Sequence, residues 1–124
     1  MEEKRKFTRI VCKMKASVQI DNMIIVEADN LNISLRGAFF ELAEYWAFKK
    51  GDRCQLTFIL PDSDIRLQFK TEVIHSTGKM VGVEFDRIDT VTMNHLKRLM
   101  ESRTLNPEQV ERELALLYRS NQTI

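Results

Sequence analysis

The chain has 124 residues, of which 44% are hydrophobic and 30% are charged, so it is long enough to form one domain around its own hydrophobic core. Its 19 basic residues nearly balance its 18 acidic residues, which leaves a formal net charge of +1. This balance argues against a general nucleic-acid-binding protein, because that class usually carries a large basic excess.

Cysteine usage and hydropathy indicate a protein of a reducing cytoplasm. Cys12 and Cys54 lie far apart in the sequence and in no metal-ligand spacing, so we expect two buried free thiols. No apolar run approaches the roughly 18 residues of a membrane span. Charged residues interrupt the N-terminal region throughout, and we therefore expect neither a transmembrane segment nor a signal peptide.

The first predicted strand follows directly on a cationic arm at residues 4–9. In residues 10–20 the even positions are apolar, and polar side chains occupy the odd positions from Lys13 onward. A period of two over this length predicts a strand with one buried face. Phe7 interrupts the cationic arm, and we expect it to anchor the arm where it enters the fold.

Further strands are predicted at short intervals along the middle of the chain. Asp21 and Asn22 suit a turn, after which apolar or alternating segments predict strands. These segments are residues 23–28, 38–42, 54–60, 65–73 and 81–85. The last two are expected to form a hairpin through a short turn at Gly78. About six short strands with turns between them indicate a sandwich or a small barrel.

Several aromatic residues gather in the third predicted strand and in the segment that follows it, and they could be read as a stacking platform. We expect most of them to be core side chains, because aromatic rings contribute so much burial energy. The residues are Phe39, Phe40, Tyr45, Trp46 and Phe48.

Beyond residue 89 the hydrophobic period changes to that of helices. A first stripe consists of Val91, Leu96, Leu99 and Met100. A second helix is predicted to begin at Asn106 and Pro107, which suit the cap and the first helical position, and its apolar residues are Val110, Leu114 and Leu117. We expect residues 1–103 to form the strand domain with its arm and first helix, and residues 104–124 to form a helical extension. The helices offer either a cover for the strands or a homodimer contact, and the sequence leaves both open.

Catalytic and metal-binding patterns are hard to find in the sequence. His75 and His95 stand apart from any Cys, Asp or Glu in ligand spacing, and Ser34 lies in no G-x-S-x-G elbow. The four glycines are too scattered to make a phosphate-binding loop. We therefore expect no enzyme, no metal site and no cofactor.

Two local motifs remain, and each is weak when taken alone. The first is Arg5-x-x-x-Arg9 in the cationic arm, and the second is Asn32-x-Ser34-x-x-Gly37, between two predicted strands. A cationic run near a terminus is usually a solvated tail. An Asn, Ser and Gly segment is usually a turn stabilised by local side-chain hydrogen bonds.

Together and in this order, the two motifs resemble those of the PilZ domain family, the receptors for the bacterial messenger cyclic di-GMP. Members of that family carry R-x-x-x-R just before the first barrel strand and [DN]-x-S-x-x-G near a following strand. The segment at residues 81–85, VGVEF, is similar to the family's late G-V-x-F strand, and KGD at residues 50–52 is similar to its turn into a middle strand. The resemblance covers about residues 4–100. It implies a mostly β fold, a six-stranded antiparallel β-barrel with C-terminal helices.

The resemblance also implies the roles of individual residues. Arg5 and Arg9 are expected to hold phosphate and guanine, Asn32 and Ser34 to read a guanine edge, and Gly37 to shape the floor of the site. A guanidinium group suits this ligand because it can donate a fork of hydrogen bonds to guanine O6 and N7, pair with phosphate and stack on a purine.

Three further cations lie near these motif residues. Lys4 and Lys6 are expected to add positive field rather than specific bonds. Arg36 could reach the ligand or only solvent, and both interpretations stay open.

The resulting hypothesis is a cyclic di-GMP receptor, with no nucleic-acid polymer as a partner. The dianionic ligand would order the cationic arm and so relay the signal to an unidentified protein partner. The alternative is an interaction adaptor of the same fold that binds no nucleotide. A barrel that binds single-stranded nucleic acid would need a long basic groove, which a net charge of +1 does not favour.

Overall fold

A computed structural model of the chain describes the backbone of residues 7–20 and 24–122, and the side chains as far as residue 119. The strands along these residues are β1 Ile10–Cys12, β2 Ala16–Gln19, β3 Ile25–Ile33, β4 Gly37–Leu42, β5 Arg53–Ile59, β6 Arg66–Thr77 and β7 Met80–Phe85. The helices are α1 Thr90–Arg103 and α2 Pro107–Gln122.

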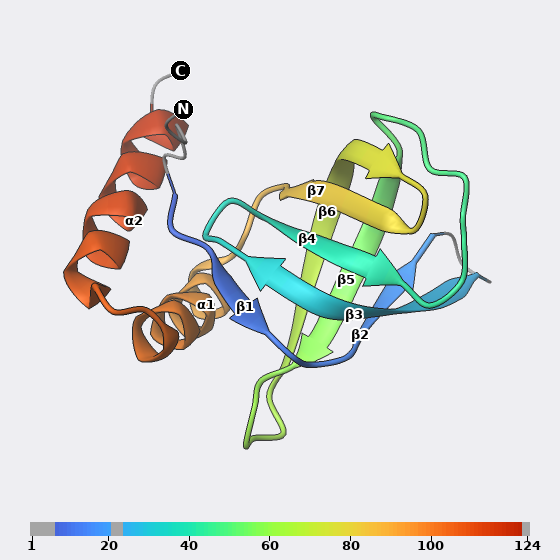
Figure 1. The fold of residues 1–124 in the computed structure, drawn as a ribbon. Helices are drawn as coiled ribbons and strands as arrows, with labels where there is room; N and C mark the ends of the chain where they lie inside the picture. Colours follow the sequence, from blue (N-terminus) through green and yellow to red (C-terminus); the bar gives the residue numbers. More distant parts are fainter. Residues whose placement is uncertain (1–6, 21–23, 123–124) are drawn as a thin grey trace, which may run out of the picture.

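Six of these strands close into an antiparallel barrel (Figure 1). The order around the ring is β3, β2, β5, β6, β7 and β4, and pairing between β4 and β3 closes it. The short strand β1 is added outside this ring, antiparallel to the end of β3. The six-stranded antiparallel β-barrel with C-terminal helices is thus confirmed, and β6 and β7 form the predicted hairpin.

The expectation of one continuous strand over residues 10–20 is wrong. The chain forms β1 and β2 instead, and both pair with β3. Between the two paired stretches, residues 13–15 lie opposite Asp29 and Asn30, so three residues face two. Asn30 has φ 54°, a left-handed conformation that bends β3 at this bulge. The alternation was still informative, because Ile10, Cys12, Ala16 and Val18 are all buried.

The second strand was predicted too short and the loop after it too long. The structure extends β3 to Ile33, so Asn32 belongs to a strand, and β4 begins at Gly37. Only the three residues between them form the connection. This difference matters for function because it places the two ends of the Asn-x-Ser-x-x-Gly motif on paired strands.

The two helices lie together on one side of the barrel, and the chain that leads into β1 runs beside α2 (Figure 1). Buried side chains of α1 and α2 belong to the same hydrophobic core as the barrel interior, and they include Met93, Leu96, Met100, Val110 and Leu114. Val91, predicted to face inward, is 67% exposed because the buried stripe of α1 runs through Met93 instead. In the described part of the chain, neither helix has the length and apolar character that a membrane crossing requires.

The aromatic residues after β3 behave mainly as predicted. Phe40 and Phe48 are buried in the core, and Trp46 packs against it. Tyr45 is exposed, and Phe39 is half-buried on the outer face of β4. Both cysteines are buried free thiols, and burial raises the pKa of each.

Candidate functional site

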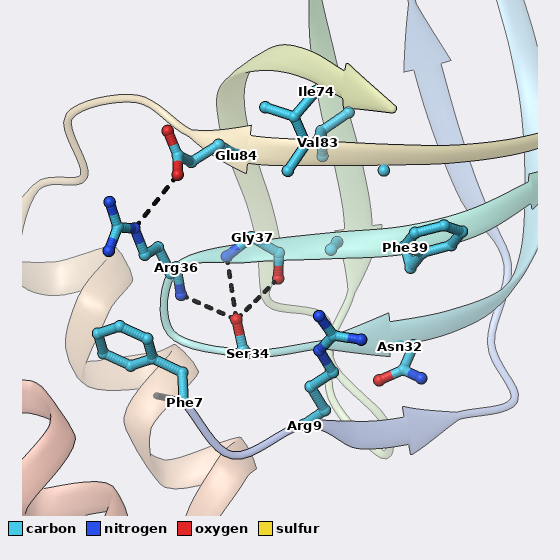
Figure 2. A pocket seen from close by; sticks show the side chains of 12 residues that line it. Phe7, Arg9, Asn32, Ser34, Arg36, Gly37, Phe39, Ile74, Val83 and Glu84 are labelled. Atoms are coloured by element: carbon cyan, nitrogen blue, oxygen red, sulfur yellow. Dashed lines mark hydrogen bonds and ion pairs between the residues drawn. The ribbon is translucent and has the colours of Figure 1, made fainter. Parts of the chain in front are cut away.

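A hollow with a volume of about 210 Å³ lies on the outer face of the barrel, between the chain that leads into β1 and strands β3, β4 and β7 (Figure 2). Its lining residues are Phe7, Arg9, Asn32, Ser34, Arg36, Gly37, Ala38, Phe39, Ile74, Gly82, Val83 and Glu84. The structure therefore brings the predicted Arg9, Asn32, Ser34 and Gly37 together, with Arg36 beside them. The other predicted residues, Arg5, Lys4 and Lys6, lie outside the described residues.

Strand register explains why Asn32 faces the hollow. Leu31 and Ile33 point into the barrel and are fully buried, so the side chain between them must point outward. On the outer face Asn32 is paired with Val11 of β1 on one side and with Phe39 of β4 on the other. The alternation of β3 thus places a polar group at the centre of an otherwise apolar row.

The Asn32 side chain carries an unusual feature. Its Oδ1 atom is buried and has no hydrogen-bond partner among the described residues. A buried acceptor left without a donor typically costs about 1–3 kcal/mol, so such groups call for an explanation. Because the terminal torsion of Asn is broad, a small rotation can aim this oxygen into the hollow. It is thus an acceptor that an incoming donor can satisfy.

The connection between β3 and β4 is built around the Ser34 hydroxyl (Figure 2). The Oγ atom accepts hydrogen bonds from the backbone N–H groups of Arg36 and Gly37, each at 3.1 Å. The hydroxyl in turn donates to the Gly37 carbonyl at 3.4 Å, and the backbone N–H of Ser34 donates to the same carbonyl at 2.9 Å. Both lone pairs of the hydroxyl are thus engaged within the turn, and Ser34 is 8% exposed.

Gly37 is required by the close approach of two strands. A Cβ atom at this position would lie 2.2 Å from the carbonyl oxygen of Val83 on β7, well inside any normal contact. Strand β4 pairs there with β7, with Gly37 opposite Glu84. The glycine therefore serves the pairing of β4 with β7, and the floor of the hollow depends on that pairing.

Arg9 supplies the positive charge of the hollow. Its side chain is exposed, and its guanidinium group has no hydrogen-bond or ion-pair partner among the described residues. In Figure 2 it reaches over the hollow between the Ser34 turn and Asn32. An unpaired guanidinium beside an unsatisfied amide oxygen presents both donors and an acceptor to the same space.

The Arg36 side chain contacts Glu84 and Phe7. Its Nε atom lies 3.2 Å from Oε2 of Glu84, and its guanidinium carbon lies 5.8 Å from the centre of the Phe7 ring. Both charged side chains are about half exposed, so the ion pair contributes little stability and can exchange for another anion. Phe7 packs against the hydrophobic core, as predicted for the anchor of the arm.

Six lining residues were missed by sequence reasoning as parts of a site, namely Ala38, Phe39, Ile74, Gly82, Val83 and Glu84. Phe39 lies on the outer face of β4, where Gly82 of β7 is its register partner, and a Cβ at Gly82 would lie 3.0 Å from the Phe39 ring. The ring also lies 5.8 Å from that of His75, which is exposed as expected for an isolated histidine. Ile74 is 47% exposed at the bulge of β6. A glycine opposite an aromatic residue was the available signal, but it requires the strand register to be recognised.

The small closed barrel thus presents an arginine and an amide together at one hollow on its outer face (Figure 2). The model of the PilZ domain family matches residues 3–102, which is most of the chain. The chain belongs to the PilZ domain family, and that family is generally associated with cyclic di-GMP binding. No curated protein matches the chain significantly.

Proposed function

We propose that the chain is a cyclic di-GMP receptor whose hollow holds one guanine and an adjoining phosphate. The observation that carries this proposal is the meeting of two groups without partners among the described residues. The Arg9 guanidinium is an unpaired donor, and Asn32 Oδ1 is a buried, unsatisfied acceptor at the same hollow. A ligand that fits must bring negative charge or acceptors to Arg9 and a donor to Asn32.

Guanine meets both demands. Its Watson–Crick edge offers the N1–H and N2–H₂ donors to the Asn32 oxygen, and its O6 and N7 atoms accept a guanidinium fork. In the same orientation, adenine would place its N1 acceptor and C2–H against the Asn32 oxygen, and its N6–H₂ donor would face the Arg9 guanidinium where guanine has O6. At about 210 Å³ the hollow is smaller than the roughly 300–1,000 Å³ of sites that enclose a whole drug-sized ligand, which suits a single base with its phosphate.

The remaining motif residues take different parts in this proposal. Ser34 and Gly37 support the site by building the turn and the β4–β7 pairing, because the Ser34 hydroxyl is already engaged. Arg5 is proposed to hold the second guanine or phosphate, and Lys4 and Lys6 to add positive field. Arg36 can exchange its exposed pair with Glu84 for a ligand phosphate.

Relay to a protein partner is the further part of the proposal. We infer that binding orders the cationic arm, residues 4–9, against the barrel, and so builds or hides a surface for the partner. A cytoplasmic location belongs to the same proposal. Hydrogen exchange over residues 2–12, with and without saturating cyclic di-GMP, tests the relay, and unchanged protection would contradict it.

Calorimetric titration tests the binding itself. We expect cyclic di-GMP to bind the full chain, and cyclic di-AMP and GTP to bind far more weakly, because adenine mismatches Asn32 and GTP carries only one guanine. Binding should weaken as salt concentration rises, since phosphate pairing with arginine is screened. An absence of heat with cyclic di-GMP, or equal affinity for cyclic di-AMP, would overturn the proposed function.

A further inference from the structure

A buried carboxylate joins α2 to the segment that carries Arg9. Glu113 of α2 is only 2% exposed, which is rare for an acidic residue. Its Oε1 atom accepts a hydrogen bond from the backbone N–H of Thr8 at 2.9 Å, and its Oε2 atom accepts one from the Thr8 hydroxyl at 2.7 Å. Both carboxylate oxygens thus bind one residue of the segment that leads into β1.

The chemistry of this contact makes it strong and directional. A carboxylate withdrawn from water is costly unless donors replace its hydration, and hydrogen bonds to charged groups are about twice as strong as neutral ones. Thr8 supplies two donors in a fixed relation to each other, one from the backbone and one from the side chain. A leucine at position 113 could fill the same space, but it would leave the orientation of Thr8 undetermined.

The position of Thr8 connects this contact to the hollow. On one side of it, Phe7 packs against the core and lies beside the Arg36 guanidinium. On the other side, Arg9 lines the hollow. Fixing both the backbone and the side chain of Thr8 therefore limits where the Cα of Arg9 can lie and where its guanidinium can reach.

We propose that Glu113 is a positioning residue of the cyclic di-GMP site, which acts on the ligand through Thr8 and Arg9. This role rests on the proposed function. It makes α2, which lies beyond the residues matched by the family model, a part of the binding machinery. By reciprocity, a ligand that binds Arg9 in this position also stabilises the docking of α2 on the arm segment.

Substitutions at both ends of the contact test the proposal by titration of the full chain with cyclic di-GMP. Thr8→Val keeps the shape and removes the hydroxyl donor, and we expect it to weaken binding about threefold to tenfold, because Arg9 is then less often in its binding position. Thr8→Ser keeps both donors and should bind as the parent does. Glu113→Leu should weaken binding at least as much as Thr8→Val, and the double variant no further than Glu113→Leu.

Glu111→Leu is the matched control. It makes the same change two residues away on α2, where the carboxylate pairs with Lys97 of α1 and not with the arm segment. We expect the affinity of this variant to stay within about twofold of the parent, since surface ion pairs contribute little.

Amide exchange gives a readout that a merely structural contact would not move. Saturating cyclic di-GMP should slow exchange at the Thr8 amide and at α2 amides near Glu113 in the parent chain. In Thr8→Val the ligand-induced slowing at α2 should shrink, because the route from the hollow to the helix is weakened.

The outcomes separate the two proposals. If the parent chain binds cyclic di-GMP but Thr8→Val and Glu113→Leu bind equally well, or the ligand leaves α2 exchange unchanged, the positioning role is overturned and the proposed function stands. If the parent chain does not bind, the proposed function fails and the role of Glu113 in binding fails with it. If Glu113→Leu does not fold, the comparison of Thr8→Val with Thr8→Ser decides.

Discussion

The two sides of the hollow are held in place in different ways. On the side of β3 and β4, the geometry comes from strand pairing, the Ser34 turn and the close approach of Gly37 to β7. On the side of the arm, Arg9 depends on Phe7 packing and on Thr8, which binds the carboxylate of Glu113, 105 residues further along the chain. The strand side is therefore part of the barrel's stability, whereas the exposed Arg9 side chain on the arm side can change with little effect on the fold.

The largest expected effect is on the arm side and concerns affinity alone. Arg9→Ala should weaken cyclic di-GMP binding on the order of a hundredfold, because a hydrogen bond to a charged group is worth about 1.5–3 kcal/mol and Arg9 is expected to make more than one. The free energy of unfolding should barely change, since the side chain is exposed. Calorimetry and urea denaturation measure the two quantities.

Arg98→Ala is the control for this substitution, because it removes the same charge from an exposed position on α1. Its affinity should match that of the parent. A large fall in the free energy of unfolding of Arg9→Ala would contradict the distinction, because Arg9 would then support the fold as the strand side does.

Gly37→Ala changes the strand side, and we expect it to lower the stability of the fold. The added methyl group meets the Val83 carbonyl oxygen, so β4 and β7 must separate, at an expected cost of about 1–3 kcal/mol in the free energy of unfolding. Gly82→Ala is the matched comparison, since its Cβ would meet the Phe39 ring at 3.0 Å and the His75 Cβ at an ordinary 3.5 Å, and the Phe39 side chain can move aside. Equal losses in the two variants, measured by chemical denaturation, would contradict the backbone explanation.

Asn32→Leu sharpens the comparison because it concerns a strand residue that should affect binding more than stability. Removing the amide should weaken cyclic di-GMP binding about tenfold, the worth of one good hydrogen bond to the base. Stability should hold or rise slightly, since the unsatisfied Oδ1 atom is gone. A clear fall in stability with unchanged affinity would show that Asn32 is structural.

The smallest expected effect is that of Ser34→Ala. Two backbone N–H groups lose their acceptor, which should lower the free energy of unfolding by about 1 kcal/mol. Affinity should fall less than in Asn32→Leu, because the Ser34 hydroxyl is engaged in the turn. A larger loss of affinity than in Asn32→Leu, measured by the same titration, would return Ser34 to the role of a direct ligand contact.

Local patterns in the sequence were sufficient for much of the fold. Alternation identified the strands and their buried faces, and the change of period located both helices, with α2 beginning at Pro107 as predicted. The break between β1 and β2 was not predictable in this way, because it depends on the left-handed Asn30 in the partner strand. Burial follows from the chain's own period, but continuity of a strand depends on what it pairs with.

The candidate site could likewise be predicted from the sequence only in part. The two motifs indicated Arg9, Asn32, Ser34 and Gly37, and the structure gathers them at one hollow. The ordinary interpretation of an Asn, Ser and Gly segment, a turn with local side-chain hydrogen bonds, already described the Ser34 hydroxyl correctly. The resemblance predicted a ligand contact instead, because a motif names a residue and not its hydrogen-bond partners. The contact between Thr8 and Glu113 was also beyond sequence reasoning, since nothing local to either residue marks the other.

The contact between Thr8 and Glu113 also bears on the order in which the protein forms during synthesis. Thr8 leaves the ribosome before the seven strands and Glu113 after them, so the carboxylate reaches its partner only when all seven strands have been made. The barrel can close as soon as β7 emerges, but Arg9 gains its support later. A nascent or truncated chain that ends before α2 can therefore be folded as a barrel and still be incomplete as a receptor.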